Sequence, residues 1–316
     1  MVRRLYPSDL SDEQWPLIEL MITAWKQDRA GRSATGGPGT CDLREVVNAI
    51  FYQNRTGCQW RYLPHDLPAW SAVFYYFTLW RQDGLDQRTQ ELLRCQVREK
   101  ARRLEDPSLV IIDPQSVPAA AGVPKTTTGL DANKRTPGRK RGLAGDVLSL
   151  IIGVDVLAAS AHNNAAGTAL PDQTAERCGM RLENALVDQG LKDEVIIHGA
   201  LLDITVAVGR RNPADQGKGF VPQPKRRVVE QVNGTLMPDR RLAREYDHRP
   251  DTSASRVYWA STANMTRRLT HTHSHLARHP PGDRVNTTEF LTDLQARHDK
   301  ATARAGPVNF AARSRT

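Results

Sequence analysis

Apolar residues in the first hundred positions recur at the three- and four-residue spacing of amphipathic helices. Five of them in residues 42–51 fall on one helical face: Leu43, Val46, Val47, Ile50 and Phe51. We predict further helices that begin after Ser11 or Asp12 and near Ser71, and a charged helix over residues 86–103. Two interpretations of these short basic helices stay open, a helix-turn-helix DNA reader or an all-helical core domain.

Aromatic residues are concentrated between positions 60 and 80. They are Trp60, Trp70, Phe74, Tyr75, Tyr76, Phe77 and Trp80. Because such rings bury a large apolar area, we predict that they form a core rather than a surface on which bases stack.

The pattern changes after residue 107 to short apolar runs rich in β-branched residues. Residues 108–113 lie between two prolines and predict a buried strand that ends on a carboxylate, Asp113. That carboxylate is either a rigidly held metal ligand or the start of an ordinary turn with Pro114. We predict later strands over 147–158, 183–188 and 203–208, and a helix over 167–180.

Two more acidic residues could form a site together with Asp113. The run at 183–188 also ends on an aspartate, Asp188, and turn chemistry explains two such strands less easily than one. A basic helix is predicted from Lys225, with Glu230 one turn after Arg226 on the same face. An acid on a helix beside a sheet that offers two aspartates would complete a three-carboxylate site.

The formal charge of the chain is +9, from 44 Lys and Arg against 35 Asp and Glu. Such a surplus favours a polyanionic partner, and nucleic acid is a commoner one than a membrane surface. One basic cluster, Arg139, Lys140 and Arg141 between two glycines, is predicted to be a solvated loop or hairpin tip. Beside a metal site it would be well placed to hold phosphates.

The cysteines and the apolar runs predict the compartment. The four cysteines are too far apart for a C-x-x-C zinc or redox pattern. The N-terminus lacks the apolar core of a signal peptide, and the longest apolar run, 147–159, is interrupted by Asp155 and too short to span a bilayer. We therefore expect a cytoplasmic protein without a membrane segment.

Several motifs occur in order along the chain. In the helical half they are Leu10-Ser-Asp-Glu-Gln-Trp15, residues 55–64 and Phe74-Tyr-Tyr-Phe77. In the second half they are Ile112-Asp-Pro-Gln-Ser-Val117, Gly138-Arg-Lys-Arg141, Val187-Asp-Gln-Gly190, residues 222–230 and residues 240–246. Together they resemble the DDE transposases of bacterial insertion sequences, in the insertion-sequence-five family, over about residues 5–268.

The resemblance implies an α+β architecture in three parts. A helical domain over residues 1–104 would bind DNA ends, and an RNase H-like α/β domain with a mixed central sheet would cover 105–268. Residues 269–316 lie outside the resemblance, and we expect this tail to be disordered. In such enzymes the first Asp lies on the first strand, the second just after a neighbouring strand and the Glu on a later helix.

The resemblance also implies the chemistry. Asp113, Asp188 and Glu230 would hold two Mg²⁺ ions, with Mn²⁺ as a substitute, for cleavage and strand transfer at the terminal inverted repeats. The basic residues expected to contact double-stranded DNA are Arg226, Lys225, Arg139, Lys140, Arg141, Arg240 and Arg241. A homodimer on DNA, associated with the bacterial nucleoid, is the natural expectation.

Some positions depart from the family pattern. Gln223 and Met237 stand where relatives often have Tyr and Lys, and Gly234 and Pro238 predict a weakened helix after Glu230. These departures favour an alternative, a decayed transposase that only binds DNA. A third hypothesis is a helical DNA-binding regulator whose second half is a dimerisation scaffold.

Overall fold

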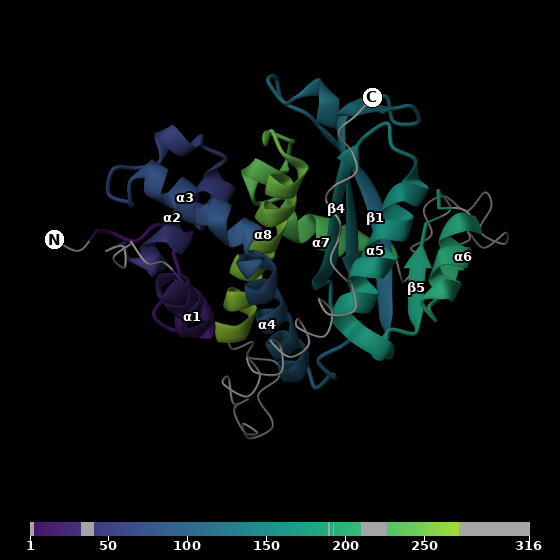
Figure 1. Cartoon of the computed structure of the whole chain (residues 1–316), viewed down its shortest axis with the longest axis horizontal. Helices are drawn as coiled ribbons and strands as arrows, with labels where there is room; N and C mark the ends of the chain where they lie inside the picture. The colour runs from purple at the N-terminus through teal and green to yellow at the C-terminus, as the bar shows by residue number, and fades with distance from the viewer. Residues whose placement is uncertain (1–2, 33–40, 189, 192, 210–225, 272–316) are drawn as a thin grey trace. The chain divides into compact units, whose positions relative to one another are not determined.

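Four helices precede the sheet in the computed structural model, which describes residues 3–32, 41–188, 190–191, 193–209 and 226–271 (Figure 1). They are α1 (Pro16–Arg32), α2 (Leu43–Thr56), α3 (Trp70–Gln82) and α4 (Leu85–Lys100). The helices predicted from apolar spacing are confirmed, within a few residues at their ends. Asp42 caps α2 by accepting hydrogen bonds from two backbone N–H groups, and Gly57 ends it with a φ of 76°, which favours glycine.

Among the described residues, six strands form one mixed sheet. They are β1 (Leu109–Pro118), β2 (Gly129–Asp131), β3 (Thr136–Gly145), β4 (Ile151–Ala158), β5 (Asn184–Val187) and β6 (Thr205–Val208). β1 lies between β3, which is antiparallel to it, and β5, which is parallel. β2 and β4 pair with successive parts of β3, and β6 pairs in parallel with β5. Helices followed by a mixed sheet make this an α+β chain, as predicted.

Helices cover both faces of the sheet (Figure 1). α5 (Asn163–Cys178) and α6 (Asp193–Leu201) pack on one face, whose apolar layer includes Ile112 and Val187. α7 (Arg226–Leu236) and α8 (Pro250–Thr270) pack on the other, with Leu143 of β3 and apolar residues of β4. No helix in the described part of the chain is both long and apolar enough to cross a membrane.

Helix α8 joins the sheet to the N-terminal helices, a role that the sequence analysis did not anticipate. Trp259 is fully buried, and its ring centroid lies 5.4 Å from that of Trp80 in α3 and 6.3 Å from that of Phe51 in α2. The neighbouring residues Val257 and Tyr258 belong to the apolar layer against β4. These elements lie in one compact unit, Met1–His271; the tail beyond it is outside the described residues.

Two local predictions are corrected. β1 continues through Pro114, which pairs with Gly142, so Asp113 neither ends its strand nor starts a turn. Only the pairing with β5 stops beside it, at Ile112. Helix α7 runs through Gly234 and ends at Leu236, two residues before Pro238, so Gly234 does not interrupt the helix after Glu230. Nothing lies within 4 Å of the position a Cβ would take at Gly234.

The aromatic cluster is core only in part. Phe77 and Trp80 are fully buried, which confirms the prediction for them. Trp70, Phe74 and Tyr75 are 39%, 43% and 55% exposed, so the prediction is wrong for these three. They lie on the outer face of α3, whose other face is buried, so their position around the helix directs them away from the core.

Candidate functional site

Asp113 and Asp188 follow directly on a pair of residues that face each other on neighbouring parallel strands. Ile112 of β1 pairs with Val187 of β5, and both side chains lie in the apolar layer under α5 and α6. Because successive side chains of a strand alternate between faces, Asp113 is directed to the opposite face, the one covered by α7. Asp188 is the first residue after β5, next to β1, and adjacent strands are about 4.8 Å apart. The fold therefore brings the two aspartates to the same level of neighbouring strands.

Helix α7 lies over this face and contacts Asp113 itself. The side-chain amide of Asn233 donates to Asp113 Oδ2 at 3.4 Å. A groove runs between the helix and the strands, lined by Ile111, Asp113, Leu143, Gly145, Val228, Val232 and Asn233. Gly145 allows this approach, since a Cβ there would lie 3.2 Å from Val232 Cγ2. Half-buried Asp113 therefore borders a groove whose other wall is the helix with Glu230.

Glu230 is exposed on α7, one turn before Asn233. Residues three apart on a helix are neighbours on its surface, so Glu230 lies on the same side of α7 as the residue that contacts Asp113. Asn233 itself was missed, because the sequence around it was interpreted as helix damage. Its three-residue spacing from Glu230 was the pattern that could have identified it.

The chemistry of these donors fits a hard divalent cation, since carboxylate oxygens are the ligands that Mg²⁺ prefers. The geometry is less complete. Within the described ranges, no three His, Cys, Asp or Glu residues form a group that could hold a metal ion. The structure thus brings Asp113 and Asp188 to adjacent strands, and Glu230 to the covering helix, without closing a three-ligand site.

The prediction that residues 139–141 form a solvated basic loop is wrong. Arg139, Lys140 and Arg141 lie in β3 and are 0%, 6% and 3% exposed. Lys140 Nζ donates to the carbonyl oxygen of Ala161 at 2.5 Å and to Asn163 Oδ1 at 2.7 Å. A cluster that is buried and engaged in this way is not a solvated loop, and its position gives no support to a direct contact with DNA.

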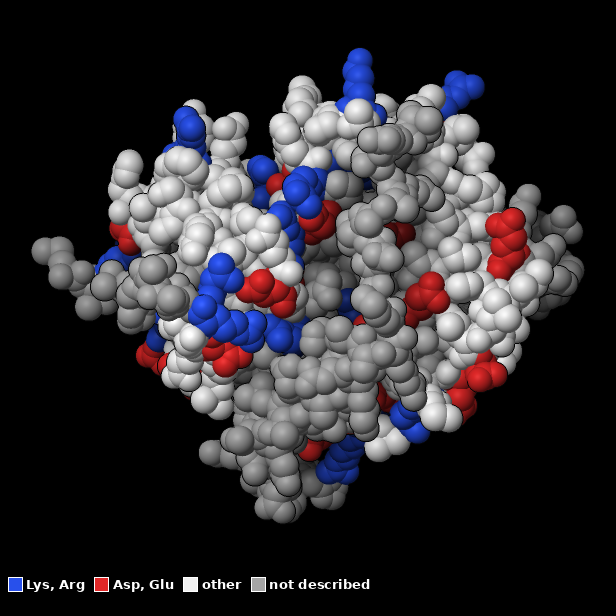
Figure 2. Space-filling view, in the orientation of Figure 1, with Lys and Arg blue, Asp and Glu red and all other residues white. Residues whose placement is uncertain are grey.

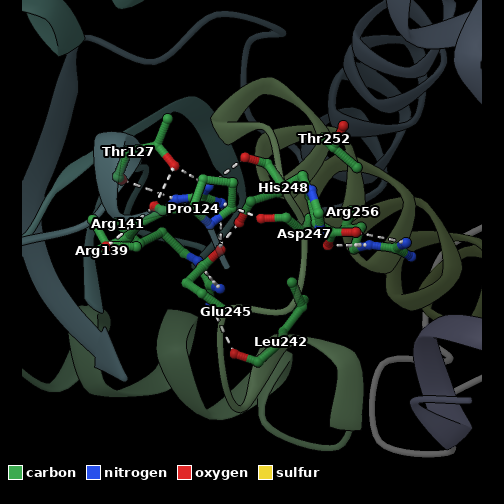
Figure 3. A network of polar contacts seen from close by, with 12 residues as sticks. Pro124, Thr127, Arg139, Arg141, Leu242, Glu245, Asp247, His248, Thr252 and Arg256 are labelled. Carbon is green, nitrogen blue, oxygen red and sulfur yellow. Dashed lines mark hydrogen bonds and ion pairs between the residues drawn. The ribbon is translucent and has the colours of Figure 1, made fainter. Parts of the chain in front are cut away.

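Both arginines of β3 turn toward one buried carboxylate, Glu245 (Figure 3). Arg141 Nη2 donates to Glu245 Oε1 at 2.6 Å and Arg139 Nη1 to Oε2 at 3.4 Å. Arg139 also donates to the carbonyl oxygens of Asp247 and His248, each at 2.8 Å. A buried charge needs such partners, because desolvation without them is costly. The cluster therefore ties β3 to the segment between α7 and α8.

A second ion pair extends this network to the N-terminal helices (Figure 3). Arg256 of α8 donates to both oxygens of Asp247, at 2.5 and 3.0 Å, and to the side chains of Gln53 and Asn54 in α2. Burial alone would raise the pKa of Asp247, but Arg256 and then Arg241 hold it below its ordinary value. The fully buried Arg256 thus connects α2, α8 and the segment before α8.

The other predicted DNA-binding residues differ in their surroundings. Arg240 is exposed at the start of the short 3₁₀ helix η5 (Arg240–Leu242). Arg241 is half-buried, pairs with Asp247 at 3.5 Å and lies over the Tyr246 ring at 5.0 Å. Arg226 is the first residue of α7, but its side chain, like all of Lys225, lies outside the described part of the structure.

These observations define an α+β protein in which Asp113 of a mixed sheet borders a groove under α7. Residues 10–89, within the helical region, match a family model whose description is "Putative transposase of IS4/5 family (DUF4096)". The resemblance to insertion-sequence transposases is thereby confirmed over this segment. No curated protein and no solved structure matches the chain.

Proposed function

We propose that this chain is a transposase that binds the terminal inverted repeats of its insertion sequence and carries out metal-dependent DNA cleavage and strand transfer. The family match supports the transposase class through residues 10–89. The observation that carries the chemical part lies outside that match: Asp113 and Asp188 directly follow paired residues of adjacent parallel strands, and Asp113 borders the groove at α7.

An RNase H-like arrangement of the sheet is part of this proposal. The resemblance implies a first Asp on the first strand, a second just after a neighbouring strand and a Glu on a later helix. The chain has Asp113 on β1, Asp188 directly after β5 and Glu230 in α7. The order of elements and the parallel pairing of β1 with β5 support the assignment.

In this proposal Asp113, Asp188 and Glu230 would hold two Mg²⁺ ions, or Mn²⁺ in their place. Such ions, when bound, favour attack on a phosphodiester and stabilise the leaving oxygen. The role of the protein is to hold the carboxylates in a fixed orientation. Asp113 is held by β1 on one side and by the amide of Asn233 on the other, so its orientation is set before any ligand arrives.

Partners follow from the same proposal. Double-stranded DNA would contact Arg226, Lys225, Arg240 and Arg241. Joining two transposon ends needs two active sites, so a homodimer on DNA is proposed. The surplus of nine positive charges favours association with the polyanion at a distance.

A second candidate, a transposase remnant that binds DNA without cutting it, is favoured by one observation. The described residues form no group of three potential metal ligands. Against this candidate, α7 continues past Glu230 without a break. The two functions differ in a single measurable property, metal-dependent strand cleavage.

The test compares cleavage of a labelled DNA carrying the element's own end, with Mg²⁺, by the wild-type chain and by Asp113→Asn. Because even outer-shell partners of a metal cost 10- to 100-fold, loss of a direct ligand should lower the rate by more than about 100-fold. Asp203→Asn is the matched control, since Asp203 is exposed and has a φ of 58°, a conformation Asn tolerates. DNA binding by both proteins without any cleavage would establish the remnant instead.

A further inference from the structure

Two arginines from helix ends meet around one buried carboxylate at the junction of α2, α8 and η5. Asp239 immediately precedes η5, and its side chain is 8% exposed. Arg55, in the last turn of α2, places Nε 3.9 Å from Asp239 Oδ1. Arg267, in the last turn of α8, is half-buried and interacts electrostatically with both groups. Arg240 follows Asp239 directly and is exposed.

The packing of η5 on the end of α2 fixes these residues in place. Gly57 ends α2, and a Cβ there would lie 3.2 Å from Cβ of Arg240. Arg241 reaches the carbonyl oxygen of Gly57 at 3.5 Å from the same short helix. On the other side, Asn264 of α8 donates to the carbonyl oxygen of Thr235 near the end of α7 at 2.9 Å. Helices α2, α8 and η5 therefore meet through backbone packing as well as through side chains.

The charges at this point do not balance. Arg55 and Arg267 bring two guanidinium groups to the carboxylate of Asp239, and Arg240 follows that residue directly in the chain. Arg241 is excluded from the count because it is paired with Asp247. Burial and then electrostatic repulsion from Arg55 hold the pKa of Arg267 below its ordinary value.

The carboxylate between them is itself poorly solvated. Burial raises the pKa of Asp239 to about 6, although Arg55 and Arg267 both act to lower it. The carboxylate is therefore protonated below about pH 6 and mostly ionised at pH 7. The C-terminal ends of α2 and α8 favour positive charge through their dipoles, and Arg55 and Arg267 lie in those last turns.

We propose that Arg55, Arg240 and Arg267 form a binding site for the phosphate backbone of DNA. The guanidinium fork suits phosphate oxygens, and the exposed Arg240 and partly exposed Arg55 give access to it. Figure 2 shows Lys and Arg side chains, interspersed with Asp and Glu, in the middle of the drawn face. Backbone contacts of this kind position a duplex without reading its sequence.

The site deepens the proposed function and rests on it. Glu230 lies six residues before the end of α7 at Leu236, about 9 Å along the helix axis at 1.5 Å per residue, and Asp239 follows three residues later. A strand whose phosphates were held here would pass along the helix that carries the third proposed acid. Arg55 of α2 and Arg267 of α8, which are far apart in the sequence, would thus contribute to one DNA contact.

The test is the salt dependence of DNA binding, measured without metal so that it does not require cleavage. A fluorescein-labelled duplex of random sequence is titrated in EDTA at salt concentrations from about 50 to 200 mM. Each lost phosphate contact lowers the slope of log affinity against log salt by about 0.9. Arg55→Gln and Arg240→Gln should each show this loss, and the double variant about twice as much. Arg55→Lys, which keeps the charge, should restore most of the slope.

Two further variants separate a phosphate contact from a structural role. Arg32→Gln is the control, because its side chain is 83% exposed at the end of α1 and pairs only loosely with Asp28, at 3.6 Å. Asp239→Asn removes the competing carboxylate and should strengthen binding, whereas damage to the fold would weaken it. Thermal unfolding of each variant identifies any that are not folded.

The outcomes are distinguishable from those of the cleavage test. Slopes for Arg55→Gln and Arg240→Gln equal to that of Arg32→Gln would overturn the site even if the wild type cuts DNA. The expected slopes in a protein that never cuts DNA would support the site and refute only the chemical part of the proposed function. A wild-type chain that does not bind the duplex would overturn both.

Discussion

Arg256 is the residue whose replacement tests the buried ion network most directly. It is fully buried, and it holds Asp247 through two hydrogen bonds of 2.5 and 3.0 Å. It also donates to Asn54 Oδ1 at 3.0 Å and lies over the Trp60 ring at 5.3 Å. Replacing it with Met keeps an unbranched apolar stem and removes every donor.

Arg256→Met should lower the free energy of unfolding by about 3–5 kcal/mol, the usual cost of breaking a buried pair by removing one partner. Asp247 would keep only Arg241, at 3.5 Å, to compensate its charge. Two side-chain oxygens of α2 would also lose their donor. Urea unfolding followed by tryptophan fluorescence measures the change, because Trp259 and Trp80 are buried together nearby.

The control is Arg249→Met. Arg249 also pairs with an aspartate, Asp251 at 2.7 Å, but its side chain is 68% exposed, so the change should be much smaller than that of Arg256→Met. The double variant Arg256→Met/Asp247→Leu should recover part of the loss, since apolar residues can replace a buried pair. If Arg256→Met destabilised the protein no more than Arg249→Met, the network would have no stabilising role.

The remaining predictions concern a buried acid and two glycines. Burial raises the pKa of Asp86 from its ordinary 3.8 to about 6, so the folded chain binds this proton more tightly than the unfolded chain. The free energy of unfolding should therefore fall by up to about 3 kcal/mol as pH rises from about 4 to about 6. Asp86→Asn should flatten this decline in unfolding measurements across the same pH range. An unchanged decline in the variant would assign the effect to another group. Gly138→Ala should destabilise by at least about 1–3 kcal/mol, because its Cβ would lie 2.0 Å from the carbonyl oxygen of Val117. Gly234→Ala in the open face of α7 should instead stabilise by about 0.5–1 kcal/mol, and equal effects in the same urea assay would contradict both assignments.

Local patterns determined where most elements begin and end. Helix α2 follows from an apolar stripe, a capping Asp42 and a terminating Gly57, all of which act within a few residues. The same holds for β5, whose short apolar run and following Asp188 are visible in the sequence. Helix α8 was not predicted, because many of its buried positions are small or polar residues, such as Ser255 and Thr262, whose burial depends on the helices around them.

The fate of the basic cluster was decided by residues far away in the chain. Arg139 and Arg141 resemble a solvated charge run in sequence, and nothing within the run indicates burial. Their common partner, Glu245, is more than a hundred positions away, and only the packing of the segment before α8 against β3 brings it to them. A charge can be buried only where its partner is supplied, and a one-dimensional pattern does not contain that information.

The candidate site divides in the same way. The sequence by itself determined that Asp113 and Asp188 each follow an apolar run and that Glu230 lies on a helix one turn after Arg226. The register of β1 on β5 decided that Asp113 and Asp188 directly follow paired residues of adjacent strands, because another register would offset them along the sheet. The packing of α7 decided that Asn233 is the residue in contact with Asp113. Side-chain period is a property of each strand alone, whereas adjacency exists only once strands and helices have paired.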